Sequence, residues 1–236
     1  DGEVNHLSPL RPTSITTSTV SSGNAGNVTV RSPQISVING ASIGSDAGLS
    51  EQFDVGQTGV VNIAASEFIT ISGDSSFFGN SSIGSFTFRA GVGNLIEIDT
   101  PKLQLLDGGE VATTTFGNAD RAGNISIYTD ELTLSGTGID FDGHPTPSQL
   151  NASSRGTGQA GTIAVQSDRV SLSNGAEISV SGIVAGRAGN IYLDAEDIEV
   201  DRSTILAETA YGQGNIFLNS NNIQLRDRSQ ITANAT

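Results

Sequence analysis

The sequence predicts an all-β protein built as a parallel β-helix (β-solenoid), in which three short strands form each rung. Three observations predict this fold. A short motif recurs seven times along the 236 residues, apolar residues alternate within each copy, and one internal spacing is nearly constant. Successive copies are expected to stack in register, so that about seven to eight rungs with variable loops share one core.

The first strand of each repeat follows a glycine or Gly-Asn step. Gly123-Asn124-Ile125-Ser126-Ile127 is typical, with apolar residues at every second position, which is the period of a strand that buries one face. The glycines suit turns that require a positive φ. The asparagines of this step are expected to form an inward ladder of side-chain amides that bond the rungs above and below, at Asn27, Asn94, Asn124, Asn190 and Asn215.

The second strand starts at a nearly fixed distance from the first. The last apolar residue of the first strand and the first apolar residue of the second are five positions apart in six copies, and six positions apart between Ile63 and Ile69. A third strand follows a turn that contains glycine or serine. All variation in repeat length is expected between the third strand and the next first strand, so the scaffold would carry loops there. An antiparallel sandwich, the competing fold, leaves the constant spacing unexplained.

The chain is expected to be one segment of this fold over residues 1–236. It contains no methionine and shows no capping element at either end, so we expect a fragment of a longer repeat protein. Residues 1–25 are expected to be the tail of a preceding rung, with its last strand at 14–20.

Charge and composition exclude several classes of protein. Lys and Arg number 11 against 25 Asp and Glu, a net charge of −14, whereas a nucleic-acid-binding protein needs a basic patch. No apolar stretch approaches the roughly 18 residues of a spanning helix, so no membrane insertion is expected. The absence of cysteine excludes disulfides, thiolate metal sites and cysteine nucleophiles. His6 and His144 stand in no histidine-rich metal motif.

The repeat motif is clearest in three stretches: Leu172-Ser173-Asn174-Gly175-Ala176-Glu177-Ile178-Ser179-Val180, Gly186-Arg187-Ala188-Gly189-Asn190-Ile191 and Arg228-Ser229-Gln230-Ile231-Thr232-Ala233. They resemble the repeats of filamentous-haemagglutinin-like large exoproteins, especially those of cyanobacteria. The resemblance covers nearly the whole chain and is strongest over 159–236 and 119–136.

This resemblance implies a right-handed β-helix that is exported by two-partner secretion, through an outer-membrane pore protein. It also implies an extracellular location or the outer surface of a Gram-negative-type bacterium. The partners would be the secretion pore and a glycan or protein ligand at the cell surface or in the matrix, and the role would be adhesion or the structure of a matrix or sheath. The secretion domain that such a pore recognises is not evident in the sequence.

An enzyme is the alternative from another class, because polysaccharide lyases and hydrolases also use parallel β-helices. A glycoside hydrolase needs two carboxylates beside a cleft. Asp140, Asp142 and His144 open what is expected to be the longest variable loop, residues 140–160, and Arg155 lies in the same excursion. These four residues are candidate ligand contacts around a polar pocket, and no residue is assigned a catalytic role.

Aromatic residues form a second candidate contact surface. Phe53, Phe78, Phe86 and Phe88 are the residues expected to contact a carbohydrate or protein ligand, since exposed aromatic patches usually mark contact sites. The alternation Phe86-Thr87-Phe88 predicts an extra strand that packs against the side of the stacked rungs. A third set is expected to line one exterior face from outward positions in the first strands, at Tyr128, Tyr192 and Phe217.

Carboxylates recur at the first turn of the repeats, at Glu67, Asp99, Asp130, Asp168 and Asp194 or Glu196. Stacked at rung spacing they would repel one another without counter-ions, and hard cations bind oxygen-rich rows. The nonapeptide of calcium-binding β-rolls is absent, however. The sequence therefore predicts no cofactor and leaves calcium as the one open alternative.

The sequence as a whole predicts a structural and adhesive segment of a secreted surface exoprotein, without enzyme activity. Its rod would present loops for contact with cells, matrix or glycans. The β-helical polysaccharide-active enzyme remains one alternative. The other is a module whose ends stack on neighbouring chains to form a filament by end-to-end self-association.

Overall fold

All regular secondary structure in the described part of the chain is β-strand, and most strand pairs are parallel. The computed structural model describes residues 13–48, 56–75, 79–88, 91–117, 121–140, 142–182, 184, 186–210 and 212–235. Among these residues no helix has the length and apolar character needed to cross a membrane. The prediction of an all-β chain of parallel strands is confirmed.

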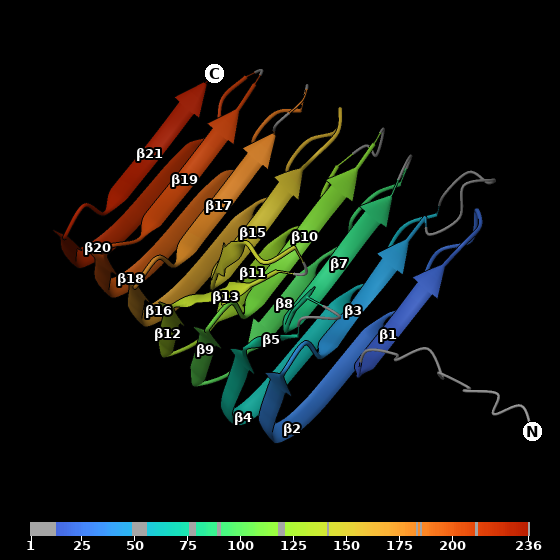
Figure 1. Cartoon of the computed structure of the whole chain (residues 1–236), viewed down its shortest axis with the longest axis horizontal. Coiled ribbons are helices and arrows are strands. Elements are labelled where there is room, and N and C mark those ends of the chain that lie inside the picture. Colours follow the sequence, from blue (N-terminus) through green and yellow to red (C-terminus); the bar gives the residue numbers. More distant parts are fainter. Residues whose placement is uncertain are drawn as a thin grey trace, which may run out of the picture.

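The third strands of the repeats form one parallel sheet whose spatial order follows the sequence (Figure 1). Each strand pairs with that of the repeat before it and that of the repeat after it, so no strand crosses over a neighbour. The strands are β1 (Ser14–Thr19), β3 (Ser42–Ala47), β7 (Ser82–Phe88), β10 (Glu110–Phe116), β15 (Gln149–Ser154), β17 (Glu177–Gly182), β19 (Thr204–Thr209) and β21 (Gln230–Ala235). The expected strand at 14–20 is therefore β1, which pairs in parallel with β3.

The first and second strands of the repeats lie together in a second parallel sheet. In five repeats they are one continuous strand of 11 or 12 residues. In two repeats they remain separate, as β8 (Ile96–Asp99) with β9 (Lys102–Leu106) and as β11 (Ile125–Tyr128) with β12 (Glu131–Ser135). The strands are β2 (Val28–Ile38), β4 (Val61–Ser72), β8 (Ile96–Asp99), β9 (Lys102–Leu106), β11 (Ile125–Tyr128), β12 (Glu131–Ser135), β16 (Ile163–Ser173), β18 (Asn190–Asp201) and β20 (Asn215–Arg226).

The expectation of three separate strands per repeat is thus wrong for most repeats. The chain bends between the first and second strands, but the bend keeps most of its pairing with the neighbouring repeat. At both breaks, one carbonyl oxygen accepts two N–H groups of the next repeat. That of Pro101 accepts the Asp130 and Glu131 N–H at 3.0 and 2.9 Å, and that of Asp130 accepts the Asp168 and Arg169 N–H at 3.1 and 3.0 Å.

The apolar side chains of successive repeats stack directly above one another. Ile127 pairs with Val165, which pairs with Leu193, and all three are at most 3% exposed. The same holds in the second strands, where Leu134, Leu172 and Val200 are in register and buried. Because parallel strands lie about 4.8 Å apart, each side chain covers the one below it. The predicted ladders of inward apolar residues are confirmed.

Asn27, Asn124 and Asn215 are exposed, contrary to the expectation of an inward ladder, and Asn94 occupies the glycine position of the step. The expected bond between amides of adjacent repeats forms between Asn215 Nδ2 and Asn190 Oδ1, at 2.9 Å. Asn124 precedes the buried Ile125, so the alternation of a strand directs its side chain to solvent. It still bonds the next repeat: its Oδ1 accepts the Thr162 N–H at 2.9 Å, and Asn27 Oδ1 accepts the Val60 N–H at 2.8 Å.

The glycines of this step are required by close approach and not by positive φ. A Cβ on Gly161 would lie 1.7 Å from the carbonyl oxygen of Gly123, and one on Gly189 would lie 1.7 Å from that of Gly161. Neither glycine has a positive φ. The backbones of these adjacent repeats therefore touch at this corner, and a Cβ on Gly161 or Gly189 would overlap the preceding repeat.

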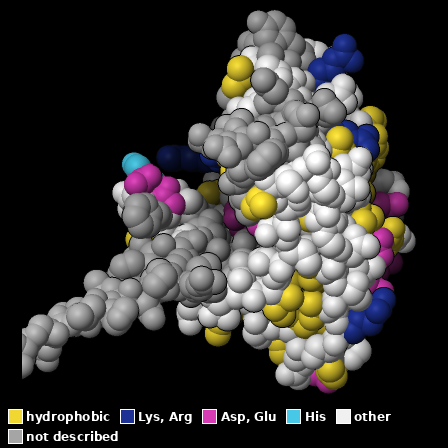
Figure 2. Space-filling model, turned by 90° about the vertical axis from the view of Figure 1, so that its right-hand side faces the viewer, with side chains coloured by type: hydrophobic (Ala, Val, Ile, Leu, Met, Phe, Trp, Pro, Cys, Tyr) yellow, Lys and Arg dark blue, Asp and Glu magenta, His cyan; other side chains and the backbone are white. Residues whose placement is uncertain are grey.

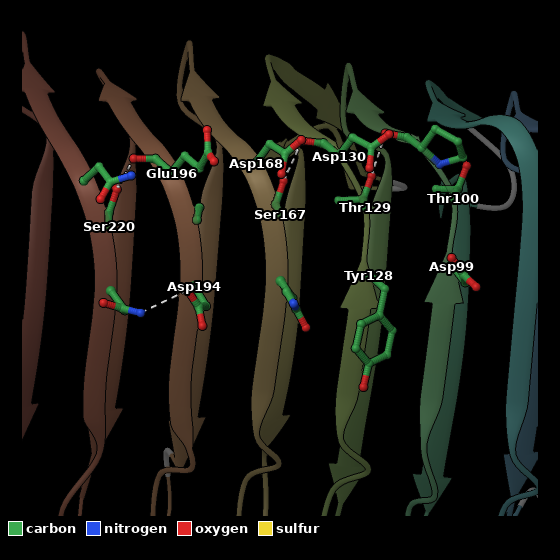
Figure 3. A pocket seen from close by; sticks show the side chains of 15 residues that line it. Asp99, Thr100, Tyr128, Thr129, Asp130, Ser167, Asp168, Asp194, Glu196 and Ser220 are labelled. Carbon is green, nitrogen blue, oxygen red and sulfur yellow. Dashed lines mark hydrogen bonds between the residues drawn. The ribbon is translucent and has the colours of Figure 1, made fainter.

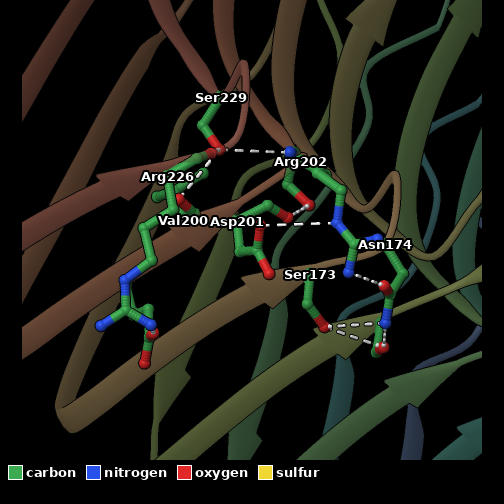
Figure 4. A network of polar contacts seen from close by, with 10 residues as sticks. Ser173, Asn174, Val200, Asp201, Arg202, Arg226 and Ser229 are labelled. Atoms are coloured by element: carbon green, nitrogen blue, oxygen red, sulfur yellow. Dashed lines mark hydrogen bonds and ion pairs between the residues drawn. The ribbon is translucent and has the colours of Figure 1, made fainter.

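Positive φ occurs instead at the turn between the second and third strands. Asn174 and Gly175 have φ of 58° and 87°, while Asp227 and Arg228 have 48° and 68°. Side chains of adjacent repeats cross-link these turns (Figure 4): the Arg202 guanidinium donates to Asn174 Oδ1 at 2.7 Å, and Ser229 Oγ donates to the Val200 carbonyl at 2.8 Å.

Two insertions also leave the chain at this turn, so the expectation that all length variation follows the third strand is wrong. One is the hairpin of β5 (Asp74–Ser75) and β6 (Gly79–Asn80), and the other is the hairpin of β13 (Thr137–Ile139) and β14 (Pro145–Pro147). Each has a closed neck: the Ser81 N–H donates to the Gly73 carbonyl at 2.9 Å, and the Ser148 N–H donates to that of Gly136 at 3.0 Å. The closed neck leaves the stacking of the repeats intact.

Candidate functional site

A groove of about 520 Å³ runs across the strands at the bend between the first and second strands (Figure 3). It spans five consecutive repeats and is lined by three rows of side chains, each row taking one position per repeat. We call it the corner groove. Its first row is Asp99, Tyr128, Gln166, Asp194 and Asn219, its floor is Thr100, Thr129, Ser167, Ala195 and Ser220, and its third row is Pro101, Asp130, Asp168, Glu196 and Asn221.

The floor hydroxyls hold the bend together. Ser167 Oγ donates to the Arg169 carbonyl of its own repeat at 2.8 Å, or to the Asp130 carbonyl of the preceding repeat at 3.0 Å. Ser220 repeats the arrangement with the carbonyls of Asn222 and Glu196, at 2.9 and 2.8 Å. Carbonyls at a bend need such donors because buried backbone groups are rarely left unpaired.

In the third row three carboxylates lie on neighbouring repeats, and no Lys or Arg side chain of the groove lining stands among them. Asp130, Asp168 and Glu196 occupy the same exposed position on three consecutive repeats, about 4.8 Å apart along the groove. No side-chain partner of their carboxylates is found among the described residues. Like charges at this spacing repel one another, and salt only partly screens them.

The adjacent row, outside the groove, shows the opposite arrangement. Lys102, Glu131, Arg169 and Asp197 follow one another in register, so that charges largely alternate in sign. Lys102 Nζ lies 3.7 Å from Glu131 Oε2, and Arg169 Nη2 lies 3.5 Å from Asp197 Oδ2. Negative charge is therefore balanced one residue beyond the groove and left unbalanced inside it.

The expected row of first-turn carboxylates is thus real in outline but divided between two walls. Asp99 and Asp194 stand in the first row, where Asn219 Nδ2 donates to Asp194 Oδ1 at 3.1 Å. Glu67 does not line the groove, and its Oε2 accepts a hydrogen bond from Gln34 Nε2. Sequence spacing could not reveal the two walls, because the bend places neighbouring residues on different sides.

The predicted polar loop is the tip of the second hairpin, which joins β13 to β14. Asp140 Oδ1 accepts the N–H groups of Asp142 and His144 at 2.9 and 2.8 Å, and His144 Nδ1 lies 3.5 Å away. These hydrogen bonds, that of the His144 N–H first, lower the pKa of Asp140 below its usual value. The ligand atoms of the three side chains lie within 4.8 Å of one another. Figure 2 shows a histidine and carboxylates in a projection from the main body.

Arg155 does not join this cluster, and residues 140–160 are not one loop. They include β15 (Gln149–Ser154), and Arg155 follows its far end, about 20 Å of extended strand from the hairpin. The Arg155 guanidinium lies over the ring of Phe116, 5.8 Å from the centroid. The sequence-predicted pocket of these four residues therefore does not form.

The phenylalanines are distributed differently from the expectation. Phe86 and Phe88 belong to β7, a third strand of the main sheet, so the extra strand packed sideways is wrong. The ring of Phe88 stacks on Phe116 with centroids 4.9 Å apart. Phe53 and Phe78 lie outside the described residues.

One carboxyl with a shifted pKa was not singled out from the sequence. Glu110, at the start of β10, is half-buried and accepts a hydrogen bond from Gln149 Nε2 at 2.9 Å. Burial raises the pKa of Glu110, although Gln149, Arg155 and Asn80 each oppose the rise. Glu177 starts a third strand after a turn in the same way, so no local signal marks Glu110.

Comparison with known proteins finds no match to a family model, a curated protein or a solved structure.

Proposed function

We propose that the chain is a right-handed parallel β-helix that serves as a structural and adhesive segment of a secreted surface exoprotein, similar to the filamentous-haemagglutinin-like family. One observation carries the proposal: the repeats stack in register while two insertions project from their turns. A scaffold of this kind keeps its core when loops are added, so the projecting hairpins are free to contact a partner.

The two hairpins contact each other, and this favours a role in binding a partner. Strand β13 contacts both β5 and β6 although they belong to repeats two apart, and Thr146 Oγ1 donates to Asn80 Oδ1 at 3.1 Å. Two short hairpins that brace one another form a more ordered surface than either alone. Ile139 on this surface is 57% exposed.

Export through an outer-membrane pore partner, and a final location outside the cell, belong to the same proposal. They are supported by the resemblance of the repeats. The absence of cysteine does not oppose them, since the stacked core supplies stability without disulfides.

Surface labelling and adhesion test this function together. An antibody raised against residues 136–148 should label intact source cells, and protease treatment of intact cells should remove the signal. Beads coated with the chain should adhere to source cells or matrix. Replacing residues 136–148 with Asn-Gly-Ala, the turn found at 174–176, should reduce adhesion and leave the fold unchanged. Labelling only after lysis, or adhesion unaffected by the replacement of residues 136–148, contradicts the proposal.

A polysaccharide-active enzyme is the second candidate, favoured by the carboxylates that line the corner groove. Neighbouring carboxylates across or along a groove are the groups that glycoside hydrolysis uses. Release of reducing ends from neutral or acidic polysaccharides, lost in Glu196→Gln and retained in Glu208→Gln on the other sheet, would favour it. Absence of any release over a broad polysaccharide panel would leave the structural role.

A further inference from the structure

Two exposed aromatic rings stack beside the corner groove. The rings of Tyr192 in β18 and Phe217 in β20 lie within 5° of parallel, with centroids 4.8 Å apart. They are paired in register and are 39% and 48% exposed. Since their separation equals the spacing of neighbouring strands, a ring at the next position would continue the stack.

That next position is empty of aromatic groups. The register partner of Tyr192 on the other side is Ala164 in β16, and beyond it stands Ser126 in β11. The ring face of Tyr192 opposite Phe217 therefore borders two small side chains. A ring face of this kind attracts the apolar face of a flat ligand ring, which can lie over the Ala164 methyl group.

The aromatic surface continues into the corner groove. Asp194 follows Tyr192 by two residues, so the two side chains share the outer face of the strand, and both are exposed. Gln166 stands in the same relation to Ala164 and lines the groove with Tyr128, which is 47% exposed. The open ring position over Ala164 therefore borders the groove.

The negative charge of the groove limits which ligands can bind there. The groove lining contains five carboxylates and no lysine or arginine, and the three of its third row have no partner among the described residues. An acidic polysaccharide would be repelled, while a chain that carries ammonium groups would gain attraction along the whole groove.

The spacing of the carboxylates favours a glycan over a basic peptide as the ligand. The carboxylates recur about every 4.8 Å, whereas side chains on one face of an extended peptide recur about every 6.8 Å. The two carboxylate walls can meet amino groups on both sides of a glycan. The stacked aromatic rings also suit a pyranose ring better than a lysine stem.

We propose that a glycan carrying amino groups binds this surface, with one sugar ring stacked on Tyr192 above Ala164 and the ammonium groups of the sugars that follow it, in the strand direction, in the corner groove. This deepens the proposed adhesive function, on which it rests, by naming the class of ligand. This contact lies on the sheet face and is separate from the contact surface that the hairpins form.

The test is calorimetric titration of the purified chain with a glucosamine hexamer at low salt. Binding is expected, and it should weaken in about 0.15 M salt, where screening is effective over about 8 Å. Tyr192→Ala should weaken it about tenfold, and Ala164→Tyr should block the ring position. Glu208→Gln, in β19 on the other sheet and away from the groove, is the control and should bind normally. Circular dichroism of each variant confirms that it is folded.

Three ligands complete the experiment. The fully N-acetylated hexamer should bind more weakly than the glucosamine hexamer because it lacks ammonium groups. Equal binding of hexalysine and the glucosamine hexamer, both unaffected by Tyr192→Ala, would show a general anionic surface or a peptide site and overturn the proposal. So would the absence of binding by the glucosamine hexamer. Adhesion of coated beads in that case would keep the adhesive function and remove only this ligand.

Discussion

Gly161 packs against the carbonyl oxygen of Gly123 so closely that a Cβ at residue 161 would lie 1.7 Å from that oxygen. The contact joins two consecutive repeats at the corner before the first strand. The same approach recurs between Gly189 and Gly161 and between Gly59 and Gly26. The glycine at this corner therefore allows these repeats to stack closely, and its role can be tested directly.

Gly161→Ala is expected to destabilise the chain by about 3 kcal/mol or more, because the backbones of two repeats must separate to admit the methyl group. Gly23→Ala is the control, since a Cβ there meets nothing within 4 Å and its φ is not positive. Urea unfolding followed by circular dichroism measures both. Equal stability of the two variants would mean that the contact does not matter.

Arg228→Gly is expected to stabilise the last described turn by about 1 kcal/mol. Arg228 has a φ of 68°, in the left-handed region where a side chain is strained, while the equivalent Gly108 and Gly175 meet no such penalty. The reverse change, Gly175→Ala, should destabilise by a similar amount. Thermal and urea unfolding of the two variants should therefore move in opposite directions.

Glu110→Gln is expected to change how stability depends on pH. The pKa of Glu110 is raised in the folded chain by burial, so the folded state binds its proton more tightly than the unfolded state. The stability that this provides is fully present below the ordinary pKa of 4.5 and is lost as pH rises through the raised folded value. The variant should lose less stability over that window and be about 1 kcal/mol more stable at pH 7.

Urea unfolding of wild type and Glu110→Gln at several pH values between 4 and 7 measures this. Asp46, whose pKa is also raised by burial, stays in both proteins and gives a shared background of the same sign. A steeper pH dependence in Glu110→Gln than in wild type would contradict the prediction.

Asp168→Asn and Asp197→Asn should have opposite effects on stability. Asp168 stands between two unbalanced carboxylates, so its neutralisation should stabilise the chain by about 0.5 kcal/mol at low salt. Asp197 pairs with Arg169 at 3.5 Å, so its neutralisation should destabilise by a similar amount. Both differences should shrink in about 1 M salt, where the Debye length is about 3 Å. The same sign for both variants would mean that the two rows do not differ in electrostatic balance.

Much of the fold could be predicted because its signals are local and repeated. Ile125 and Ile127 alternate with polar residues, and the same alternation returns in every copy, which is enough to predict stacked parallel strands with buried ladders. The five-position spacing correctly predicted a conserved connection between first and second strands. It did not reveal that this connection is a bend inside one strand, because pairing across repeats decides where a strand ends.

The candidate sites could be predicted less well. Asp140, Asp142 and His144 are close in sequence and are brought together by one hairpin, whereas strand β15 separates Arg155 from them. The corner groove was missed as a site, since its walls combine residues such as Asp99 and Asp168 that are far apart in the chain.

The sequence by itself determined the first and second strands, which of their residues face the core and that the copies stack, because these follow from period-two alternation and from repetition. Only the tertiary structure decided that the insertions leave at the second turn and that carboxylates from two rows line one groove. The reason is that these features depend on how the chain bends and pairs across repeats, and no single repeat contains that information.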